Sequence, residues 1–513
     1  MKIGIDIGGT NTDGVIVDEN DRIIDSAKVP TTAPLEKGFN EVLKILLSRS
    51  KIPLKHIKGV FVGTTHATNA ILQCKDLYRV GVIRLAGHQP ITLPPAYGWP
   101  KRLHETILAG TLTLDGGYEC DWRPLTPSNM KQIQEAACKL MDQGAESLAI
   151  CGVFSPLHPQ QEISAAEAIQ QNVPISLSHR IGGIGLIERE NATILNAALM
   201  KVMKGGFNEL IQVCHSLGMT CPLYVTQNNG SLISLKEAIE YPVLTISAGP
   251  TNSFVGAVKL AGLHDALVVD IGGTSTDVGV VHNGFPRRCL HQSSIGGISL
   301  NFSMPDVLSI ALGGGSHIYF DQSQPRIGPE SVSRKLLQEA ISFGGNQLTL
   351  TDISLKLKQI KIAEAKITLN ISEDDAKQVF IIAKESLQSL VNRMAAEKNE
   401  LPVVLVGGGA TLIPHSLLGD RYRVPEYASV ANAFGAALAE ITETVTKVIC
   451  LDQREESIQQ LKDAVMEKLL NKGACSLSSR IVDVSVLPYF YMPGNLAKIT
   501  VTAAGKMKTQ NSG

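Results

Sequence analysis

Apolar runs at the start of the chain predict a series of short strands and helices. The first three runs are alternating or uninterrupted over about six residues, as in half-buried and buried strands. Phe39, Val42, Leu43, Leu46 and Leu47 then recur at helical spacing. In βββαβα order, the predicted elements cover 2–9, 13–20, 22–29, 35–49, 58–65 and 66–72.

A second set of strands is predicted after a long helical segment at 187–218. Gly, Pro and Asn bound each of these apolar runs, which is typical of strand ends. The later part of the chain is expected to add helices near 373–398 and at 428–441. The predicted strands cover 222–230, 242–250, 266–273, 276–284 and 402–409.

One short phrase occurs twice. DIGGTNTD stands at 6–13 and DIGGTSTD at 270–277, with seven of eight residues identical. Each copy ends a strand, turns at two glycines and enters the next strand, which predicts two similar halves. We expect an α/β fold of two domains flanking a cleft, at 1–185 and 186–445. After about residue 446 the pattern changes to one amphipathic helix and two strands, which predicts a small α/β appendage at 446–513.

The repeated phrase has the composition of a phosphate-binding hairpin. Glycines without Cβ let the backbone approach a ligand, and successive N–H groups form a concave anion site. An aspartate beside a phosphate is favourable when Mg²⁺ lies between them, so Asp6 and Asp270 are candidate metal ligands and catalytic residues. The alternative is a tight hairpin with no ligand. The candidate phosphate contacts are Gly8, Gly9, Thr10, Asn11, Thr12, Gly272, Gly273, Thr274, Ser275 and Thr276.

A third glycine turn, Gly407–Gly409, follows a strand and is a candidate contact for a nucleoside. The alternative is a helix N-terminus that needs glycine for packing. A fourth glycine run, Gly313–Gly315, is a weaker candidate for a ligand contact. The sequence contains neither GxxxxGK[ST] nor a GxGxxG followed by a ribose-binding acid, which excludes a P-loop and a Rossmann nucleotide site.

Composition narrows the class of partner. Lys and Arg number 47 against 48 Asp and Glu, so there is no basic excess of the kind that nucleic-acid or anionic-membrane binders show. No apolar stretch is long enough for a membrane span, and no secretory signal is seen. Nine scattered cysteines without zinc spacing are expected to be reduced thiols, so a cytoplasmic location is expected.

In these motifs the chain resembles the hydantoinase A / 5-oxoprolinase family, within the actin / sugar-kinase / heat-shock ATPase superfamily. The resemblance implies two ribonuclease H-like halves around a nucleotide cleft. Its pieces run in family order over roughly 1–440. They are 4–18, 62–72, 176–199, 226–234, 268–281, 309–318 and 404–414.

The resemblance implies ATP- and Mg²⁺-dependent opening of a cyclic amide such as a hydantoin or 5-oxoproline. It also implies a second, hydantoinase B-like subunit. A lactam carbonyl is a poor electrophile, and phosphorylation of its oxygen would activate it for water. Such transfer depends on positioning and on charge neutralisation, which the two hairpins would supply.

Residues where the fourth predicted strand (58–65) meets the following helix are candidates for substrate contact: Thr64, Thr65, His66 and Asn69. The alternative is a helix cap with a buried, hydrogen-bonded histidine. Asp13 and His66 are also candidate catalytic bases, and Asp13 could equally brace its hairpin. Two other functions stay open at this point: a small-molecule or sugar kinase, and an ATP-driven reactivating or assembly factor.

Overall fold

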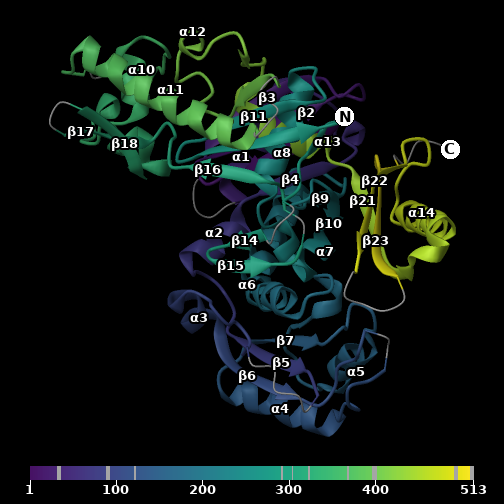
Figure 1. Cartoon of the computed structure of the whole chain (residues 1–513). Helices are drawn as coiled ribbons and strands as arrows, with labels where there is room; N and C mark the ends of the chain where they lie inside the picture. The colour runs from purple at the N-terminus through teal and green to yellow at the C-terminus, as the bar shows by residue number, and fades with distance from the viewer. Residues whose placement is uncertain are drawn as a thin grey trace.

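The computed structural model describes most of the chain. The described residues are 1–31, 36–87, 93–120, 123–289, 293–302, 304–321, 324–366, 369–395, 401–489 and 495–508. It is a mixed α/β structure in which two large sheets lie at the centre, with a smaller sheet below them and another at one side (Figure 1).

The first large sheet contains the predicted βββαβα unit. Its elements are β1 (Lys2–Ile7), β2 (Asn11–Val17), β3 (Ile23–Pro30), α1 (Glu36–Ser50), β4 (Val60–Thr64) and α2 (His66–Gln73). Antiparallel β1–β2–β3 pairing is followed by parallel β1–β4 pairing. On α1, Phe39, Val42, Leu43 and Leu46 are buried, because the helical spacing places them on the face that meets the sheet.

Two later strands complete this sheet. They are β9 (Leu223–Thr226), which pairs with β4 in parallel, and β10 (Leu232–Ser234). The sheet order is β10-β9-β4-β1-β2-β3. The first sheet thus draws strands from both sides of residue 185, where the sequence suggested a division.

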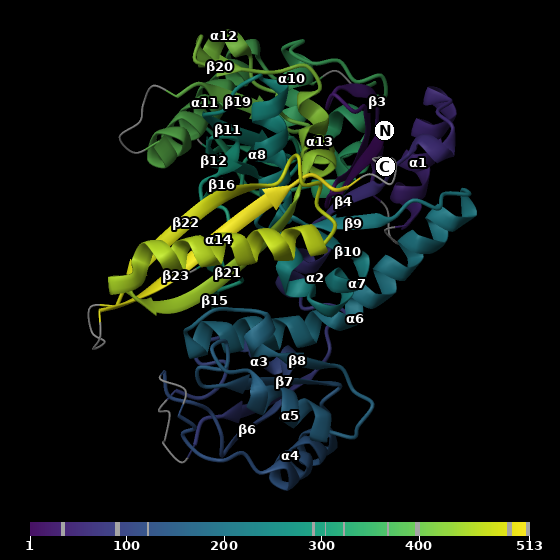
Figure 2. The same cartoon turned by 90° about the vertical axis from the view of Figure 1, so that its right-hand side faces the viewer.

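The chain between α2 and α6 forms a separate parallel sheet with the order β6-β5-β7-β8. Its elements are β5 (Val80–Leu85), α3 (Lys101–Ile107), β6 (Leu108–Leu114), α4 (Met130–Asp142), β7 (Ser147–Gly152), α5 (Gln160–Ala168) and β8 (Ile175–Leu177). It occupies the lower end of the molecule in Figures 1 and 2. The long helix α6 (Leu186–Ser216), in the predicted place, connects it to the first sheet.

The second large sheet repeats the strand order of the first. Its path is β13-β12-β11-β19-β20, with β16 also paired to β12. The β11–β12 hairpin and parallel β11–β19 correspond to β1–β2 and β1–β4, and β16 takes the place of β3. The strands are β11 (Ala266–Ile271), β12 (Thr276–His282), β13 (Phe285–Pro286), β16 (Val307–Ile310), β19 (Val403–Val406) and β20 (Tyr422–Arg423).

Two helices cross between the large sheets. They are α8 (Ala248–Leu260), which packs on the second sheet, and α13 (Ala431–Leu438), which packs on β1, β2 and β4 of the first. The crossing is close at Gly256 and Gly435, where a Cβ would meet the backbone of the opposite helix.

The strand predicted at 242–250 was wrong: the segment is a 3-10 turn, Pro242–Thr245, followed by the first residues of α8. Its apolar residues are buried, and periodicity does not separate a short buried strand from a buried helical turn.

The remaining elements surround this framework. They are α7 (Leu235–Glu240), β14 (Ser293–Ile295), β15 (Ile298–Leu300), β17 (Ser316–Asp321), β18 (Gln324–Ser331), α9 (Leu336–Glu339), α10 (Leu350–Lys356), α11 (Glu373–Ala395) and α12 (His415–Leu418). Helix α11 begins where predicted, and residues 396–398 of that prediction lie outside the described residues.

The C-terminal part forms an antiparallel sheet of order β21-β23-β22 with one helix against it. Its elements are β21 (Ile441–Cys450), α14 (Arg454–Asn471), β22 (Arg480–Pro488) and β23 (Leu496–Gly505). The predicted helix and two strands are present, and β21 is an additional strand. The helix predicted at 428–441 was too long, since α13 ends at Leu438 and Ile441 already begins β21.

Candidate functional site

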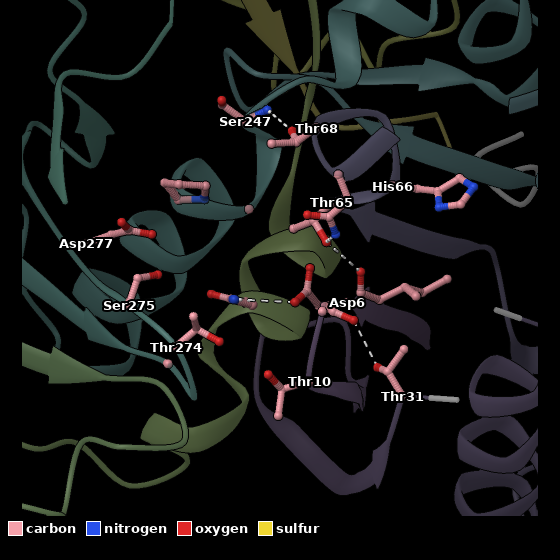
Figure 3. Close-up of a pocket in the computed structure, with 18 of the residues that line it drawn as sticks. Asp6, Thr10, Thr31, Thr65, His66, Thr68, Ser247, Thr274, Ser275 and Asp277 are labelled. Carbon is pink, nitrogen blue, oxygen red and sulfur yellow. Dashed lines mark hydrogen bonds between the residues drawn. The ribbon is translucent and has the colours of Figure 1, made fainter. Parts of the chain in front are cut away.

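A cavity of about 1520 Å³ lies between the two large sheets. The two repeated hairpins, the glycine turn after β19, the start of α8 and the first turns of α2 all contribute to its wall. Figure 3 shows Thr274, Ser275 and Asp277 from one hairpin across the cavity from Asp6 and Thr10 of the other. The predicted cleft between two equivalent elements is therefore present.

The two hairpins have the same geometry. Asp6 is paired with Asp13 across β1–β2, and Asp270 with Asp277 across β11–β12. Each turn is closed by the same backbone hydrogen bond, from Gly8 N to Asn11 O at 3.0 Å and from Gly272 N to Ser275 O at 2.9 Å.

The hairpin tips meet across the cavity. A Cβ added at Gly273 would lie 3.0 Å from Thr10 Oγ1, so the second turn has no room for a side chain there. The turns of both hairpins thus line the same cavity, as an anion held from two sides requires.

Four carboxyl groups face the cavity from these hairpins, and burial raises the pKa of each one. Burial, and then the neighbouring Asp13 carboxylate, raise the pKa of Asp6 to about 7. Burial raises the pKa of Asp270 to about 6, with Asp277 adding to the shift. Asp270 also contributes to the shift of Asp6, so the two halves interact electrostatically. Such a cluster of negative charge favours a bound cation.

The donor set at the hairpins fits a magnesium ion held jointly with a ligand. Asp6 Oδ1 is buried and has no hydrogen-bond partner among the described residues, whereas Oδ2 accepts from Asn432 Nδ2 at 3.3 Å. No group of three or more His, Cys, Asp or Glu side chains in the described part of the chain is arranged to hold a metal by itself. Mg²⁺ is commonly bound by one or two carboxylates together with phosphate oxygens and water, which fits Asp6 and Asp270.

The third glycine turn lies directly behind Asp270. Gly407 has φ +88° and donates from its N–H to Ala428 O at 2.9 Å. Gly407 and Gly408 line the cavity, and Gly409 instead packs on Ile271, to whose carbonyl its N–H donates at 2.7 Å. Two glycines of this turn thus line the cavity and the third packs against Ile271, while within the described range 401–489 no helix begins at the turn, since the next one is α12.

Replacing Gly407 by alanine is expected to disrupt the site. The new Cβ would collide with Asp270 Oδ1 and lie 2.5 Å from the Ile271 carbonyl oxygen, at a φ that L-residues rarely adopt. We expect a lower melting temperature and loss of any ligand response, measured by differential scanning fluorimetry. Gly419→Ala is the matched control, because Gly419 has φ +92° with nothing within 4 Å of its Cβ position. Equal effects of the two changes would contradict a specific role for Gly407.

The fourth glycine run supports the second hairpin from behind. Gly314 N donates to Gly272 O at 3.0 Å, and Gly315 N donates to Gly273 O at 2.7 Å. A Cβ at Gly313 would lie 2.7 Å from the backbone of Gly273 and Thr274. These glycines allow the close approach that fixes the shape of the hairpin turn.

Helix α2 brings a second group of predicted residues to the cavity. Thr65, His66 and Asn69 line it, and Asn69 Nδ2 donates to Thr65 Oγ1 at 3.2 Å. Burial lowers the pKa of His66, so its imidazole is mainly neutral at pH 7. In Figure 3 the His66 ring lies apart from the two hairpins. Thr68 Oγ1 accepts from Ser247 N at 3.1 Å and thereby ties α2 to the start of α8.

Four predicted site residues do not line the cavity: Thr12, Thr64, Thr276 and Gly409. The three threonines are buried, and their hydroxyls hold the local backbone or a neighbouring side chain. Thr12 Oγ1 is bonded to Thr31 Oγ1, Thr64 Oγ1 accepts from His66 N, and Thr276 Oγ1 donates to Leu312 O. On β2 and β12, side chains alternate between faces, so Thr12 and Thr276 face away from the aspartates that follow them.

The sequence analysis missed several cavity residues. Lys28 Nζ lies 2.9 Å from Asp13 Oδ1, Asn432 binds Asp6, and Thr31 Oγ1 donates to Gly8 O. Ser309 Oγ donates to Asp277 Oδ1 in the second half. Lys28 and Ser309 lie directly opposite Asp13 and Asp277 on β3 and β16, and for Lys28 this depends on a register shift in the β2–β3 pairing.

Comparison with known families agrees with this arrangement. The model of the hydantoinase/oxoprolinase N-terminal region matches residues 2–173, and the hydantoinase/oxoprolinase model matches residues 189–370. The chain belongs to the hydantoinase/oxoprolinase family. The resemblance inferred from the sequence is thereby confirmed.

Curated relatives of this hydantoinase/oxoprolinase chain include parts of larger enzymes. Caprolactamase subunit alpha of Pseudomonas jessenii is 24% identical over 92% of this chain and 76% of its own length. The acetophenone carboxylase gamma subunit of Aromatoleum aromaticum is 26% identical over 70% of this chain and 53% of its own. The 5-oxoprolinase 1 of Arabidopsis thaliana is 25% identical over 63% of this chain and 28% of its own.

Solved structures share the fold of this hydantoinase/oxoprolinase chain. An ATP-dependent caprolactamase from Pseudomonas jessenii superposes with a TM-score of 0.77 at 20% identity, over 99% of this chain and 88% of that one. A nucleotide-free acetone carboxylase gives a TM-score of 0.74 at 17% identity, with the same coverage. Within the described residues, no helix has the length and apolar character needed to cross a membrane.

Proposed function

We propose that this chain is the ATP-binding subunit of an ATP- and Mg²⁺-dependent cyclic amide hydrolase, acting on a hydantoin, 5-oxoproline or a similar lactam. One observation carries the proposal: two equivalent Asp-Gly-Gly-Thr hairpins face each other across one cavity, with a glycine turn beside them. The relatives support the class of reaction, since they include a caprolactamase subunit and 5-oxoprolinases.

The fold supports binding of a nucleotide between two halves. We interpret each large sheet as the core of a ribonuclease H-like half of an actin-like ATPase, because the two have equivalent strand order and each presents its hairpin to the cavity. The helices α8 and α13 cross where the halves meet. A ligand at that place would contact both halves and stabilise their closed arrangement.

The polyphosphate is assigned to the space between the hairpins. Backbone N–H groups of Gly9–Asn11 and Gly273–Ser275 would bind its oxygens from both sides, and Gly407 and Gly408 would contact the nucleoside. Gly8 and Gly272, whose N–H groups close the two turns, would let the phosphates approach the backbone closely. Asp6 and Asp270 would hold Mg²⁺, which would supply positive charge to neutralise the phosphates. The carboxylates then serve a cation, which explains why they are kept in a buried site that raises the pKa of each.

The lactam is assigned to the α2 side of the same cavity. At about 1520 Å³, the cavity exceeds the 300–1000 Å³ typical of a site for one small ligand, so it has room for a second. Thr65, His66 and Asn69 lie on that side and offer hydroxyl, imidazole and amide groups that could bind a ring carbonyl or N–H. This assignment does not involve a cluster of basic side chains of the kind that binds nucleic acid.

Activation of the lactam would proceed by phosphoryl transfer. The carbonyl oxygen attacks the γ-phosphorus and ADP leaves. Water then attacks the carbon, the C–N bond breaks with a proton going to nitrogen, and a second water releases phosphate from the acyl phosphate. The hairpins would position the phosphates for the first step. Asp13 or His66 would accept the proton of the attacking water, and His66 is suited to this because burial keeps it neutral.

Binding of Mg-ATP is the first expected result. Because the ligand would bind the folded cavity only, millimolar Mg-ATP should raise the melting temperature, by the free energy that mass action gives. The measurement is a fluorimetric melt with Mg-ATP, Mg²⁺ alone and ATP with EDTA. Absence of any shift with Mg-ATP, after nucleotide is shown not to co-purify, would count against nucleotide binding. Release of ADP and of phosphate, each measured with lactams, sugars or no substrate, then separates the hydrolase from a kinase, which forms ADP without phosphate, and from a reactivating factor.

A further inference from the structure

Lys28 is the cation on β3 that contacts the first hairpin. Its Nζ lies 2.9 Å from Asp13 Oδ1 and 3.0 Å from Asp13 Oδ2, and it donates to Ser429 O at 3.1 Å. Asp13 belongs to the first half, whereas Ser429 lies 401 positions after Lys28 along the chain. One ammonium group therefore connects the first hairpin to the part of the chain that follows the second sheet.

The far end of this connection leads to the glycine turn. Ser429 lies in the 3-10 turn Ala428–Val430, just before α13, and Ala428 O accepts from Gly407 N at 2.9 Å. A Cβ placed at Gly408 would be 3.7 Å from Lys28 Nζ. A continuous path of polar contacts thus runs from Asp13 through Lys28 and the 428–430 turn to Gly407.

The coordination of the ammonium indicates what Lys28 does. An ammonium has three N–H donors. One donates to Asp13 Oδ2 and one to Ser429 O, while Asp13 Oδ1 lies 2.9 Å away as the other atom of the ion pair. These two bonds fix the ammonium between the first hairpin and the 428–430 turn. The geometry therefore favours a residue that positions other groups over one that binds the ligand itself.

The second half provides an internal comparison. Lys28 is opposite Asp13 on β3, and Ser309 is opposite Asp277 on β16, in the equivalent strand register. Ser309 Oγ donates to Asp277, so a serine suffices to hold the aspartate of this hairpin. Its short side chain makes no equivalent contact across the cavity among the described residues. A serine is thus enough to hydrogen-bond the hairpin aspartate. The lysine in the first half makes this bond and, in addition, the contact that links the two halves.

On the basis of the proposed function, we propose that Lys28 is a positioning residue for ATP turnover. It holds the Asp13 carboxylate at a fixed place relative to the Gly407–Gly409 turn, so that both sides of the cavity keep the spacing that the reacting phosphate requires. Because it acts through Asp13, its loss should lower kcat more than it raises KM for ATP. It should also have little effect once Asp13 is already altered.

A double-mutant cycle tests this role. Lys28→Met should lower kcat for ATP turnover about 10-fold or more, as loss of an orienting group commonly does, with KM for ATP nearly unchanged. In the Asp13→Asn background the same change should alter kcat by less than about 3-fold, because coupled residues are not additive. A large rise in KM, or losses that multiply in the double variant, would show that Lys28 binds phosphate directly and would overturn the proposal.

Two further substitutions separate the bonds of Lys28. Lys28→Ser recreates the arrangement of Ser309 and Asp277, so it keeps a hydrogen bond to Asp13 and loses the contact with Ser429. We expect it to be as slow as Lys28→Met, and full activity would overturn the link between the halves. Lys28→Arg can span both acceptors and should recover most of the rate. Lys58→Met is the control, because it removes the Lys58–Glu19 ion pair outside the cavity lining.

The experiment distinguishes this inference from the proposed function. Melting curves of each variant establish that it is folded, and Mg-ATP binding by the unaltered chain is measured first. If the unaltered chain binds and hydrolyses ATP while the Lys28 variants match it, only the role of Lys28 is wrong. If the unaltered chain does neither, the proposed function fails, and the role of Lys28 in turnover fails with it.

Discussion

Replacing Asp6 or Asp270 by asparagine is expected to reduce ATP turnover by on the order of 100-fold or more. Each carboxylate lies at the end of the central strand of its half and faces the shared cavity. Asparagine keeps the shape of the side chain and removes the charge that would hold Mg²⁺ on the phosphates. Steady-state phosphate release at saturating Mg-ATP is the measurement.

The same substitutions should leave the fold intact. Burial raises the pKa of Asp6 to about 7, so at pH 8 the folded protein holds a carboxylate that its surroundings disfavour. A group whose pKa is raised on folding lowers stability as the pH rises through that pKa, and the neutral asparagine removes this cost. The melting temperature without ligand should therefore be equal or higher at pH 8.

A matched control is Asp265→Asn. Asp265 directly precedes β11, accepts from Asn283 N at 3.0 Å and lies outside the cavity lining. It should retain full turnover. If Asp6→Asn and Asp270→Asn both retain full turnover as well, the metal role assigned to these residues is wrong.

The two hairpins could be predicted from the repeated phrase because the residues that determine each turn are adjacent in the sequence. Asp, Gly-Gly and Thr determine a turn and its pairing within eight residues, and both copies adopt the same register. The apolar spacing of α1 was likewise sufficient to predict the helix and its buried face, because one face of the helix packs on one sheet. That both turns face one cavity could be inferred from the repeat alone, since equivalent elements of two similar halves can face each other.

Long-range pairing was not predictable in the same way. β9 and β10 return to the first sheet after about 150 residues that build a separate sheet, and no local pattern encodes which strand accepts them. Segment 242–250 was assigned to the wrong class because apolar residues buried all round look alike in a strand and in a helical turn. Asn432 could reach Asp6 only because α13 crosses onto the first sheet.

The position of Lys28 depends on the register of the β2–β3 pairing, in which a shift of one residue changes which side chain lies opposite Asp13. The β2–β3 hairpin has an irregularity between Ile16 and Val17, which shifts the pairing by one. Extending the pairing of Val17 with Ile23 without this shift would place Ala27 opposite Asp13, with Lys28 on the other face. The observed shift brings Lys28 opposite Asp13, and the link to Ser429 follows from it.

The cavity supplies fewer of the groups needed for the hydrolytic half of the proposed reaction than for the phosphoryl transfer. His66 is neutral, but its ring has no hydrogen-bond partner among the described residues that would orient it. Asp13 is held by Lys28 in an ion pair. A general base needs both a suitable pKa and a fixed direction toward the water. Under the proposed function, a second subunit would complete this part of the site.

The chain alone is therefore expected to hydrolyse ATP slowly and to open lactams poorly, and both rates should rise when its cognate second subunit is added. A cavity open to solvent leaves an activated lactam unprotected, and closure by a partner would exclude bulk water. The measurement is release of phosphate and of the ring-opened product with 5-oxoproline, hydantoin and caprolactam, with and without a hydantoinase B-like protein as the candidate second subunit. The Asp6→Asn chain with the same partner is the control and should stay slow, which shows that the gain depends on this cavity. Efficient ring opening by the single chain would contradict the need for a partner and would assign the base to Asp13 or His66.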